Sequence, residues 1–296
     1  MRPTVISVGS YNVDYYIVVD RLPLPGETVK AKQLYVGHGG KGSNQAVSAA
    51  RLGAASKLIA AVGDDDEGAK ALEFLRGEGV DVSGVSVKRS RTGRAYIIVS
   101  PTVGQNMIVV DPGANSELSR HDVIKALTRG DVLLASLEVP AEAVREALER
   151  FNGIKVLNPA PASSEALNLL GLADVITPNE VEALQLTGAQ SVSDAVQRLV
   201  QLVPNVVVTL GERGAVVATR GSGTLVKVPA PKVNVIDVTG AGDAFNAALA
   251  YALGCGHDVI SAVNYAVLAA SYKVTRRGAL GLRAEELSSL GVRNPC

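Results

Sequence analysis

The feature that most constrains the fold of this chain is a regular alternation of short β-branched runs with longer helix-compatible segments. Strands are predicted at residues 132–137, 155–157, 175–177 and 205–210, and helices at 141–150, 164–170, 180–186 and 193–202. Because strands joined through helical crossovers run parallel, this alternation implies a mostly parallel sheet covered by helices on both faces. Two edge strands, at 216–218 and 224–229, and helices at 241–253 and 259–274 complete the second half of the α/β pattern.

The first part of the chain shows the same alternation of strands and helices, interrupted by β-rich runs that have a different pattern. A buried strand over 4–9, a helix over 43–52, a strand over 57–62 and a helix over 68–76 fit the same parallel sheet. Two β-rich runs, at 94–100 and 106–110, are joined by a hairpin turn predicted over 101–105 with no helix between them. Together with the runs at 15–19 and 29–36, they could form a small separate sheet. We therefore expect one α/β domain over residues 1–296, with a small inserted β-sheet lid formed by about 13–36 and 93–112.

Composition excludes several classes of protein. The chain has 29 basic and 29 acidic side chains, so it lacks the overall positive charge expected of a protein that binds nucleic acid or membrane surfaces. The longest nearly apolar run, 260–270, is too short to span a bilayer, and the N-terminus does not read as a signal peptide. We expect a cytoplasmic protein whose two cysteines, Cys255 and Cys296, are reduced, and its three histidines leave little material for a metal site.

The most informative chemical motif is the run Asp237-Val238-Thr239-Gly240-Ala241-Gly242-Asp243, which leads into the apolar segment 244–253. Small residues at a strand-to-helix junction let backbone N–H groups converge on an anion, and the helix dipole adds partial positive charge. A carboxylate beside that anion site suits a base that takes a proton from a hydroxyl during phosphoryl transfer. Taken alone, the motif more often means an acidic residue that stabilises a helix start.

Residues 37–46, Gly-His-Gly-Gly-Lys-Gly-Ser-Asn-Gln-Ala, form a second glycine-rich element. They match G-x-G-x-x-G formally, but they do not directly follow the first strand, so we reject a dinucleotide fingerprint. A Walker A loop is excluded as well, because Lys41 is followed by Gly42. Lys41 and Asn44 would offer fixed donors to a polyhydroxylated ligand, and the alternative is a flexible glycine hinge.

Three shorter motifs follow predicted strands, where ligands bind in open α/β sheets. Asn12 and Asp14, on the loop beyond the first strand, would point the same way and could hold vicinal hydroxyls, or they form a simple turn. Asn179 and Glu182 fit a helix capping box, or a site that holds waters around a magnesium ion. The segment 209–214, Thr-Leu-Gly-Glu-Arg-Gly, is compatible with a plain loop or with close backbone approach to a nucleotide.

In their order and placement, these motifs resemble those of the PfkB-type sugar kinases. The resemblance runs from about residue 7 to residue 278, essentially the whole chain, and the two glycine-rich elements are its most specific part. Residues 39–46 and the segment 158–162, Asn-Pro-Ala-Pro-Ala, point to the branch of the family that phosphorylates ribose. The resemblance thus implies a ribokinase-like α/β fold and ATP-dependent transfer of phosphate to the 5-hydroxyl of D-ribose.

The resemblance also implies roles for matching residues. The catalytic residues would be Asp243, as the base, and the turn Gly240, Ala241 and Gly242. The backbone N–H groups of Ala241, Gly242 and Asp243 would form the anion hole. The sugar would contact Asn12, Asp14, Gly40, Lys41, Asn44 and Glu138. The nucleotide would contact Asn179, Thr209, Gly211, Gly214 and Gly242, and Glu182 would hold the waters of Mg²⁺. A monovalent cation, K⁺, would bind at Asp237, Thr239, Lys273, Arg276 and Gly278. The lid would pair two subunits into a homodimer.

Three residues depart from the family pattern: His38 at the rim of the sugar pocket, Val267 where a polar residue near adenine is expected, and Leu282 beside the cation site. The main alternative is a nucleoside kinase or another sugar kinase of the same family, because a ribosyl 5-hydroxyl presents similar chemistry. A second alternative, from another class, is a sugar-sensing binding protein on a kinase fold. The intact Asp243, Asn179 and Glu182 argue against that alternative.

Overall fold

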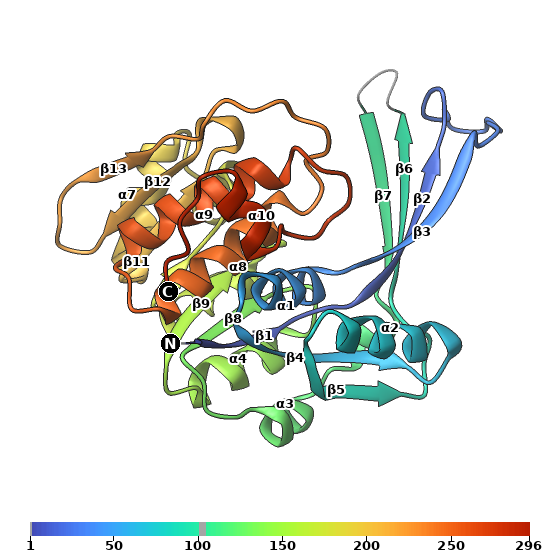
Figure 1. Ribbon diagram of the computed structural model, residues 1–296, viewed down its shortest axis with the longest axis horizontal. Helices are drawn as coiled ribbons and strands as arrows, with labels where there is room; N and C mark the ends of the chain where they lie inside the picture. Colours follow the sequence, from blue (N-terminus) through green and yellow to red (C-terminus); the bar gives the residue numbers. More distant parts are fainter. Residues whose placement is uncertain (1, 101–104) are drawn as a thin grey trace.

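A nine-stranded sheet forms the body of the protein in the computed structural model, which describes residues 2–100 and 105–296 (Figure 1). The strand order is β13-β12-β11-β10-β9-β8-β1-β4-β5. The central strand β1 (Thr4–Val8) pairs in parallel with both β4 (Ala55–Gly63) and β8 (Val132–Ser136). The chain therefore extends the sheet in opposite directions from β1, and the crevice at such a switch point is where open α/β sheets bind ligands.

The second half of the chain forms the predicted alternation. Parallel strands β9 (Ile154–Asn158), β10 (Val175–Ile176) and β11 (Asn205–Thr209) extend the sheet, and the antiparallel strands β12 (Ala215–Thr219) and β13 (Leu225–Val228) close its edge. The α/β class with a mostly parallel sheet is confirmed.

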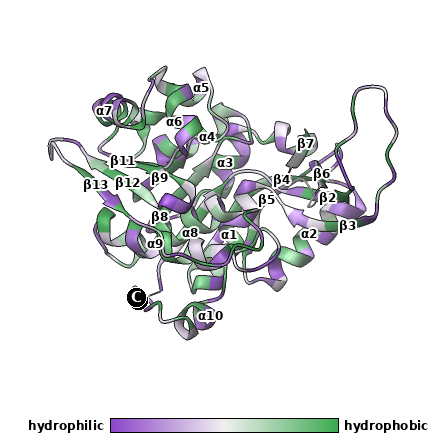
Figure 2. Ribbon diagram, turned by 90° about the horizontal axis from the view of Figure 1, so that it is seen from above, coloured by the Kyte–Doolittle hydropathy of each residue, from purple (hydrophilic) through white to green (hydrophobic). Residues whose placement is uncertain are grey.

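Helices cover both faces of this sheet because successive strand side chains point to opposite sides. One face packs against α3 (Arg120–Ala126), α4 (Ala141–Arg150), α6 (Glu180–Thr187) and α7 (Val192–Leu202). The other packs against α1 (Lys41–Leu52), α2 (Asp66–Gly77), α8 (Ala241–Gly254) and α9 (Val259–Lys273). In β4, for example, Ile59 belongs to the first apolar cluster and Leu58 to that of α1 and α2. Figure 2 shows apolar colouring along the strands and on parts of these helices. Short helices α5 (Ser164–Leu167) and α10 (Ala284–Ser289) lie at the periphery.

A second, four-stranded sheet projects from the body (Figure 1). Its order is β3-β2-β6-β7, with β2 (Asn12–Val18), β3 (Gln33–Gly39), β6 (Arg94–Ser100) and β7 (Gln105–Asp111). Stacked tyrosines stabilise both faces: Tyr15 lies against Tyr96, and Tyr16 against Tyr35. The predicted β-rich runs thus form one separate sheet, while most of the hairpin turn predicted over 101–105 lies outside the described residues. We call this sheet the lid sheet.

Two local expectations were wrong. Asn12 and Asp14 do not lie on a loop, because β2 begins at Asn12 and pairs with Gly39 and Gly37 of β3. The body sheet also contains an unpredicted edge strand, β5 (Asp81–Lys88). Its sequence mixes serine, aspartate and glycine with valine, because an edge strand buries only part of its side chains.

The expectation of reduced cysteines was also wrong, because Cys255 and Cys296 form a disulfide with a Cα–Cα distance of 5.3 Å. The C-terminal segment returns to the end of α8, where Tyr251 donates a hydrogen bond from its hydroxyl to Asn294 Oδ1 (3.1 Å) and His257 Nε2 lies 2.7 Å from the Pro295 carbonyl oxygen. Two cysteines that are 41 residues apart in sequence are thereby brought together. Sequence spacing alone did not indicate this contact.

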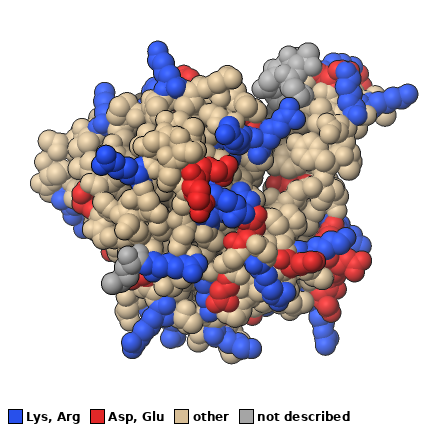
Figure 3. Space-filling model, viewed as in Figure 1, with Lys and Arg blue, Asp and Glu red and all other residues tan. Residues whose placement is uncertain are grey.

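The surface mixes both signs of charge, with acidic and basic side chains interspersed over the face in Figure 3. This pattern agrees with the balanced composition and shows no broad basic field on that face. Over residues 2–100 and 105–296, no helix has the length and apolar character needed to cross a membrane.

Candidate active site

Asp243 lies in the first turn of α8, packed against α1 at the centre of the crevice. Its side chain is buried, at 6% exposure, and it accepts hydrogen bonds from Asn44 Nδ2 (2.9 Å) and Gln45 Nε2 (3.2 Å). The Asn44 and Gln45 side-chain oxygens are buried and have no partner among the described residues. An unpaired buried acceptor beside a carboxylate is the kind of group that a ligand hydroxyl would satisfy.

Burial and neighbouring charges shift the pKa values of both Asp243 and Lys41. Burial raises the pKa of Asp243, while the Lys41 ammonium and the amides of Asn44 and Gln45 oppose that rise. Burial alone would lower the pKa of Lys41, but the carboxylates of Asp243, Glu138 and Glu182 raise it above its ordinary value. Lys41 therefore stays a cation among carboxylates, and the site holds more negative than positive charge.

Glu138 follows β8 and fastens the start of α1. Its Oε2 accepts a hydrogen bond from the Lys41 backbone N–H (3.0 Å) and another from the Ser10 hydroxyl. The segment 158–162 supports this position, because the Leu137 N–H donates to the Ala160 carbonyl oxygen (3.1 Å). Glu138 is thus placed next to Lys41, and the resemblance assigns both residues to the sugar site.

Close approach of two backbones explains the glycines at the start of α1. A Cβ on Gly42 would lie 2.5 Å from the Gly9 carbonyl carbon and 2.8 Å from the Ser10 nitrogen, so no larger residue fits. Gly40 caps the helix, with its carbonyl accepting the Asn44 N–H (2.9 Å). The glycine-rich element is therefore a tightly packed junction at the start of α1.

Asn12 and Asp14 lie on the same face of β2, as their spacing of two residues predicts. Asp14 is 6% exposed, and burial raises its pKa to about 7, although a hydrogen bond from Tyr16 opposes this. Asn12 Oδ1 accepts a hydrogen bond from Asn115 Nδ2 (2.8 Å). Because that bond uses the Asn12 oxygen as acceptor, its amide nitrogen is left to donate to a ligand.

Asn115 is a positioning residue that the sequence did not reveal. It is 1% exposed, its Oδ1 accepts the Tyr11 N–H (3.0 Å), and its Nδ2 donates to the Tyr11 carbonyl oxygen (2.9 Å) as well as to Asn12. It lies in a short 3₁₀ helix after the lid sheet, about 100 residues from its partners. The only sequence signal is the polar run Asn-Ser-Glu at 115–117, which is too common to be diagnostic.

A cavity of about 940 Å³ lies on the other side of the α8 N-terminus. Its wall contains Thr209, Gly211 and Gly214, and it also contains Ala241 and Gly242 of the turn. Apolar side chains cover much of the remainder, including Phe245, Val235, Val238 and Val267. The volume and mixed lining suit a nucleotide-sized ligand. Val267, which departs from the family pattern, does line this cavity.

The turn before α8 has the geometry of an anion site. Gly240 adopts φ 72°, and a Cβ there would lie 2.6 Å from the Ala279 carbonyl carbon, so this position requires glycine. The Ala241 N–H, which was expected in the anion hole, instead donates to the Val238 carbonyl oxygen (3.1 Å), so the N–H groups of Gly242 and Asp243 remain to face an anion. A Cβ on Gly242 would meet no atom within 4 Å, because the position borders the cavity.

Asn179 and Glu182 form the predicted capping box of α6. Asn179 Oδ1 accepts the Glu182 N–H (2.8 Å), and Glu182 Oε2 accepts the Asn179 N–H (2.9 Å). Asn179 also forms an isolated parallel β-bridge with Thr209, which lines the cavity, so Asn179 lies near the cavity edge. Glu182 is half-buried, and burial raises its pKa while Lys41 lowers it. Within the described residues, no three His, Cys, Asp or Glu side chains are grouped so that they could hold a metal ion by themselves.

The residues expected to hold K⁺ come together but do not form an open cation site. Asp237 Oδ1 accepts the Thr239 N–H (2.9 Å), and its Oδ2 accepts the Gly278 N–H (2.8 Å). Lys273 contributes its side chain to the cluster, because its Nζ donates to the carbonyl oxygens of Asp237 and Thr239. Arg276 is exposed, and its backbone N–H donates to the Lys273 carbonyl oxygen (2.9 Å).

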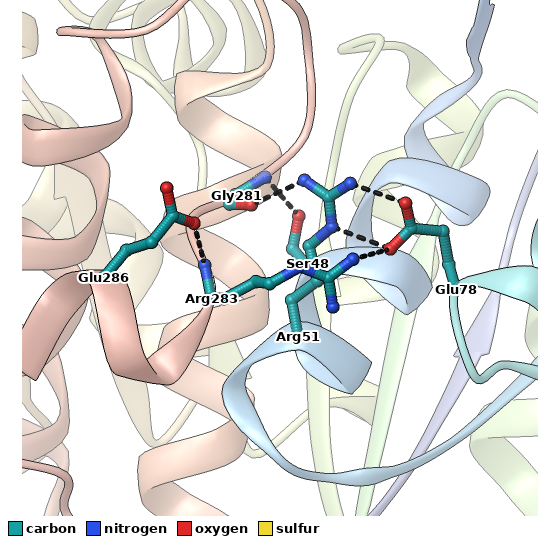
Figure 4. Close-up of polar contacts among 6 residues, drawn as sticks. All are labelled: Ser48, Arg51, Glu78, Gly281, Arg283 and Glu286. Atoms are coloured by element: carbon teal, nitrogen blue, oxygen red, sulfur yellow. Dashed lines mark hydrogen bonds and ion pairs between the residues drawn. The ribbon is translucent and has the colours of Figure 1, made fainter.

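A polar cluster behind the site fastens the segment after α9 to α1 (Figure 4). Arg51 binds Glu78 with two nitrogens (2.9 and 2.6 Å) and donates to the Gly281 carbonyl oxygen (3.1 Å). Gly281 N–H in turn donates to Ser48 Oγ (2.9 Å), and Arg283 reaches Glu78 (3.1 Å). The segment that carries Gly278 is therefore held at its C-terminal end by α1.

His38 points away from the sugar side of β3. Its ring stacks on Phe74 at a centroid distance of 3.7 Å, and Nδ1 lies 2.6 Å from the Tyr11 hydroxyl. Its neighbour Gly39 faces Asp14, and alternate residues of a strand face opposite sides. The expected effect of His38 on the sugar pocket rim is therefore wrong. Leu282 is buried in the apolar cluster of α8 and α9.

Comparisons with known proteins agree with this geometry. The family model "pfkB family carbohydrate kinase" matches residues 2–285. A ribokinase from Haemophilus influenzae is 38% identical over 294 residues, covering 94% of each chain. The solved ribokinase of Thermotoga maritima has a TM-score of 0.90 and 35% identity, covering 98% of this chain and 100% of its own. An Arabidopsis thaliana ribokinase solved with ribose and ATP has a TM-score of 0.85 and 30% identity, covering 98% of this chain and 99% of its own. This chain belongs to the pfkB family of carbohydrate kinases.

Proposed function

We propose that this chain transfers a phosphoryl group from ATP to the 5-hydroxyl of D-ribose. The observation that carries the proposal is the position of Asp243, a buried carboxylate with polar sugar-binding candidates on one side and a nucleotide-sized cavity on the other. Similarity over most of the chain to ribokinases, one of them solved with ribose and ATP, supports the choice of sugar and donor.

In the proposed mechanism, the sugar is held before it reacts. Asp14 accepts hydrogen bonds from sugar hydroxyls, Asn12 donates its amide, and Lys41 donates from the opposite side. The free oxygen of Asn44 accepts a further hydroxyl. Together these groups aim one hydroxyl at Asp243, and such positioning lowers the barrier by fixing the reacting atoms in line.

Asp243 then removes the hydroxyl proton as the new P–O bond forms. At the same time the bond between the γ-phosphorus of ATP and the oxygen that bridges it to the β-phosphate breaks, and ADP leaves. Its raised pKa makes it a stronger base than an exposed aspartate, and the neighbouring Lys41 keeps it ionised. The N–H groups of Gly242 and Asp243 and the α8 dipole stabilise the negative charge that develops on the transferred group. Glu182 would help to hold Mg²⁺ through water, and the ion would neutralise phosphate charge when bound.

The experiment that tests this proposal is a coupled ADP-release assay with purified protein, ATP and Mg²⁺ against D-ribose, 2-deoxyribose, cytidine, adenosine and fructose. We expect the highest kcat/KM with D-ribose. Highest turnover with a nucleoside would identify a nucleoside kinase of the same fold. Sugar binding without ADP release from any acceptor would instead indicate a sugar-sensing protein.

We also propose that the lid sheet pairs two copies of the chain. Apolar side chains are exposed on one of its faces, including Leu34 (60%), Val36 (55%) and Val109 (63%), and on the other face Ile108 is 56% exposed. Exposed apolar patches of this kind mark interfaces between proteins. Light scattering should give twice the chain mass, and Val109→Asp should shift the protein toward monomer if this face is the interface.

A further inference from the structure

Lys273 is a buried cation in contact with the turn that opens the active site. It is the last residue of α9, and its side chain is completely buried. Its Nζ donates to the Asp237 carbonyl oxygen (3.2 Å) and to the Thr239 carbonyl oxygen. A lysine that is removed from water needs such fixed acceptors, because an unpaired buried charge is strongly unfavourable.

These two carbonyls belong to the irregular segment and the turn that precede α8; the strand expected before this turn is absent there. Gly242, directly after the turn, lines the cavity, and the N–H groups of Gly242 and Asp243 begin α8. The Lys273 ammonium therefore contacts the carbonyl groups of this turn, whereas the proposed phosphoryl site uses the N–H groups that follow it. A positive charge on the carbonyl side fixes the turn and adds to the field felt at the anion site. Burial lowers the pKa of Lys273, and the Asp237 and Asp243 carboxylates oppose that change.

The Lys273 ammonium already occupies the carbonyl oxygens that would have to bind a monovalent cation. The carbonyl oxygens of Asp237 and Thr239 accept its protons, and both Asp237 carboxylate oxygens accept backbone N–H groups. The Lys273 carbonyl accepts the Arg276 N–H. A potassium ion at these carbonyls would therefore lie against an ammonium of the same charge, which electrostatic repulsion disfavours.

We propose that the Lys273 ammonium serves as a built-in monovalent cation for this turn, so that phosphoryl transfer by this chain does not depend on potassium. The kinetic part of the proposal rests on the proposed function. The binding part does not, because it states only that the wild-type protein has no K⁺ site at this turn.

The binding part is tested by thermal unfolding of the ligand-free protein. We compare KCl with tetramethylammonium chloride at equal ionic strength, for the wild type, Lys273→Ala and a control, Lys125→Ala, which removes an exposed lysine of α3. We expect no K⁺-specific rise in Tm for the wild type or the control. Lys273→Ala should have a lower Tm in tetramethylammonium, and K⁺ should raise it again.

The kinetic part is tested by ADP release with the sugar that gives the highest turnover. The wild-type rate should differ by less than about twofold between the two salts. Lys273→Ala should lose roughly tenfold or more in tetramethylammonium and recover in K⁺, whereas Lys273→Met, which keeps the side-chain volume but not the charge, should lose activity in both salts.

A wild-type rate that K⁺ raises fivefold or more, or a K⁺-specific rise in wild-type Tm, would overturn the proposal. So would a Lys273→Ala protein as active in tetramethylammonium as the wild type. If both variants fail to fold, the wild-type measurements still decide the question. If no substrate turns over, the proposed function fails, and the Tm measurements still test the absence of a K⁺ site.

Discussion

Replacing Asn115 by alanine tests whether this residue, which is not itself predicted to contact the sugar, holds the predicted sugar-binding residue Asn12 in place. The substitution removes three hydrogen bonds of 2.8–3.0 Å and leaves the N–H and C=O groups of the buried residue Tyr11 without these partners. An unsatisfied buried polar group costs roughly 1–3 kcal/mol, so we expect a loss of about 2–5 kcal/mol in the free energy of unfolding.

The assay combines denaturant unfolding with steady-state kinetics. Because Asn12 loses the donor that orients its amide, we expect KM for ribose to rise roughly tenfold, about 1.4 kcal/mol, while KM for ATP stays unchanged. The matched control is Asn264→Ala, in which the lost hydrogen bond, to the Ile260 carbonyl oxygen, lies on the exposed surface of α9. A stability loss below about 1 kcal/mol together with an unchanged ribose KM would refute the reasoning.

Two further predictions concern pH and the disulfide. Since burial raises the pKa of Asp14 to about 7 and its ionised form accepts the sugar hydroxyls, kcat/KM for ribose should fall as pH drops below about 7. In Asp14→Asn the group that titrates near pH 7 is absent, and its repulsion with Asp243 is removed as well, so the fall in kcat/KM should occur at lower pH. A fall that still occurs near pH 7 in this variant would contradict the assignment. Removing the disulfide by Cys255→Ser should lower the free energy of unfolding by about 4 kcal/mol at most, given a 41-residue separation, and unfolding curves with and without reductant measure it. Wild-type curves that coincide in both conditions would show that the bridge does not form.

The sequence predicted the parts of the fold that repeat a simple period. The alternation after residue 132 predicted β8 to β11 and their helices within a few residues, because buried parallel strands are continuous apolar runs. The edge strand β5 was missed because its half-exposed side chains follow no clear period. Lid sheet strands were visible as β-rich runs without helices, but their order could not be derived, because pairing depends on distant segments.

The candidate site was predictable only where a motif is local. The Asp243 turn and the start of α1 are each one continuous segment, and both lie at the crevice. Asn115 and the Lys273 ammonium were missed because their roles come from partners about 100 and 35 residues away, which no local spacing encodes. His38 was misjudged because its orientation depends on strand alternation within β3.

The central claim is that Asp243 removes the proton from a ribose hydroxyl during phosphoryl transfer. The most direct measurement is ADP release with ribose by the wild type and by Asp243→Asn, with ribose and ATP binding measured separately by calorimetry. The account predicts nearly unchanged binding of both ligands and a loss in kcat of roughly 100-fold or more. Near-normal turnover of ribose by Asp243→Asn would contradict it.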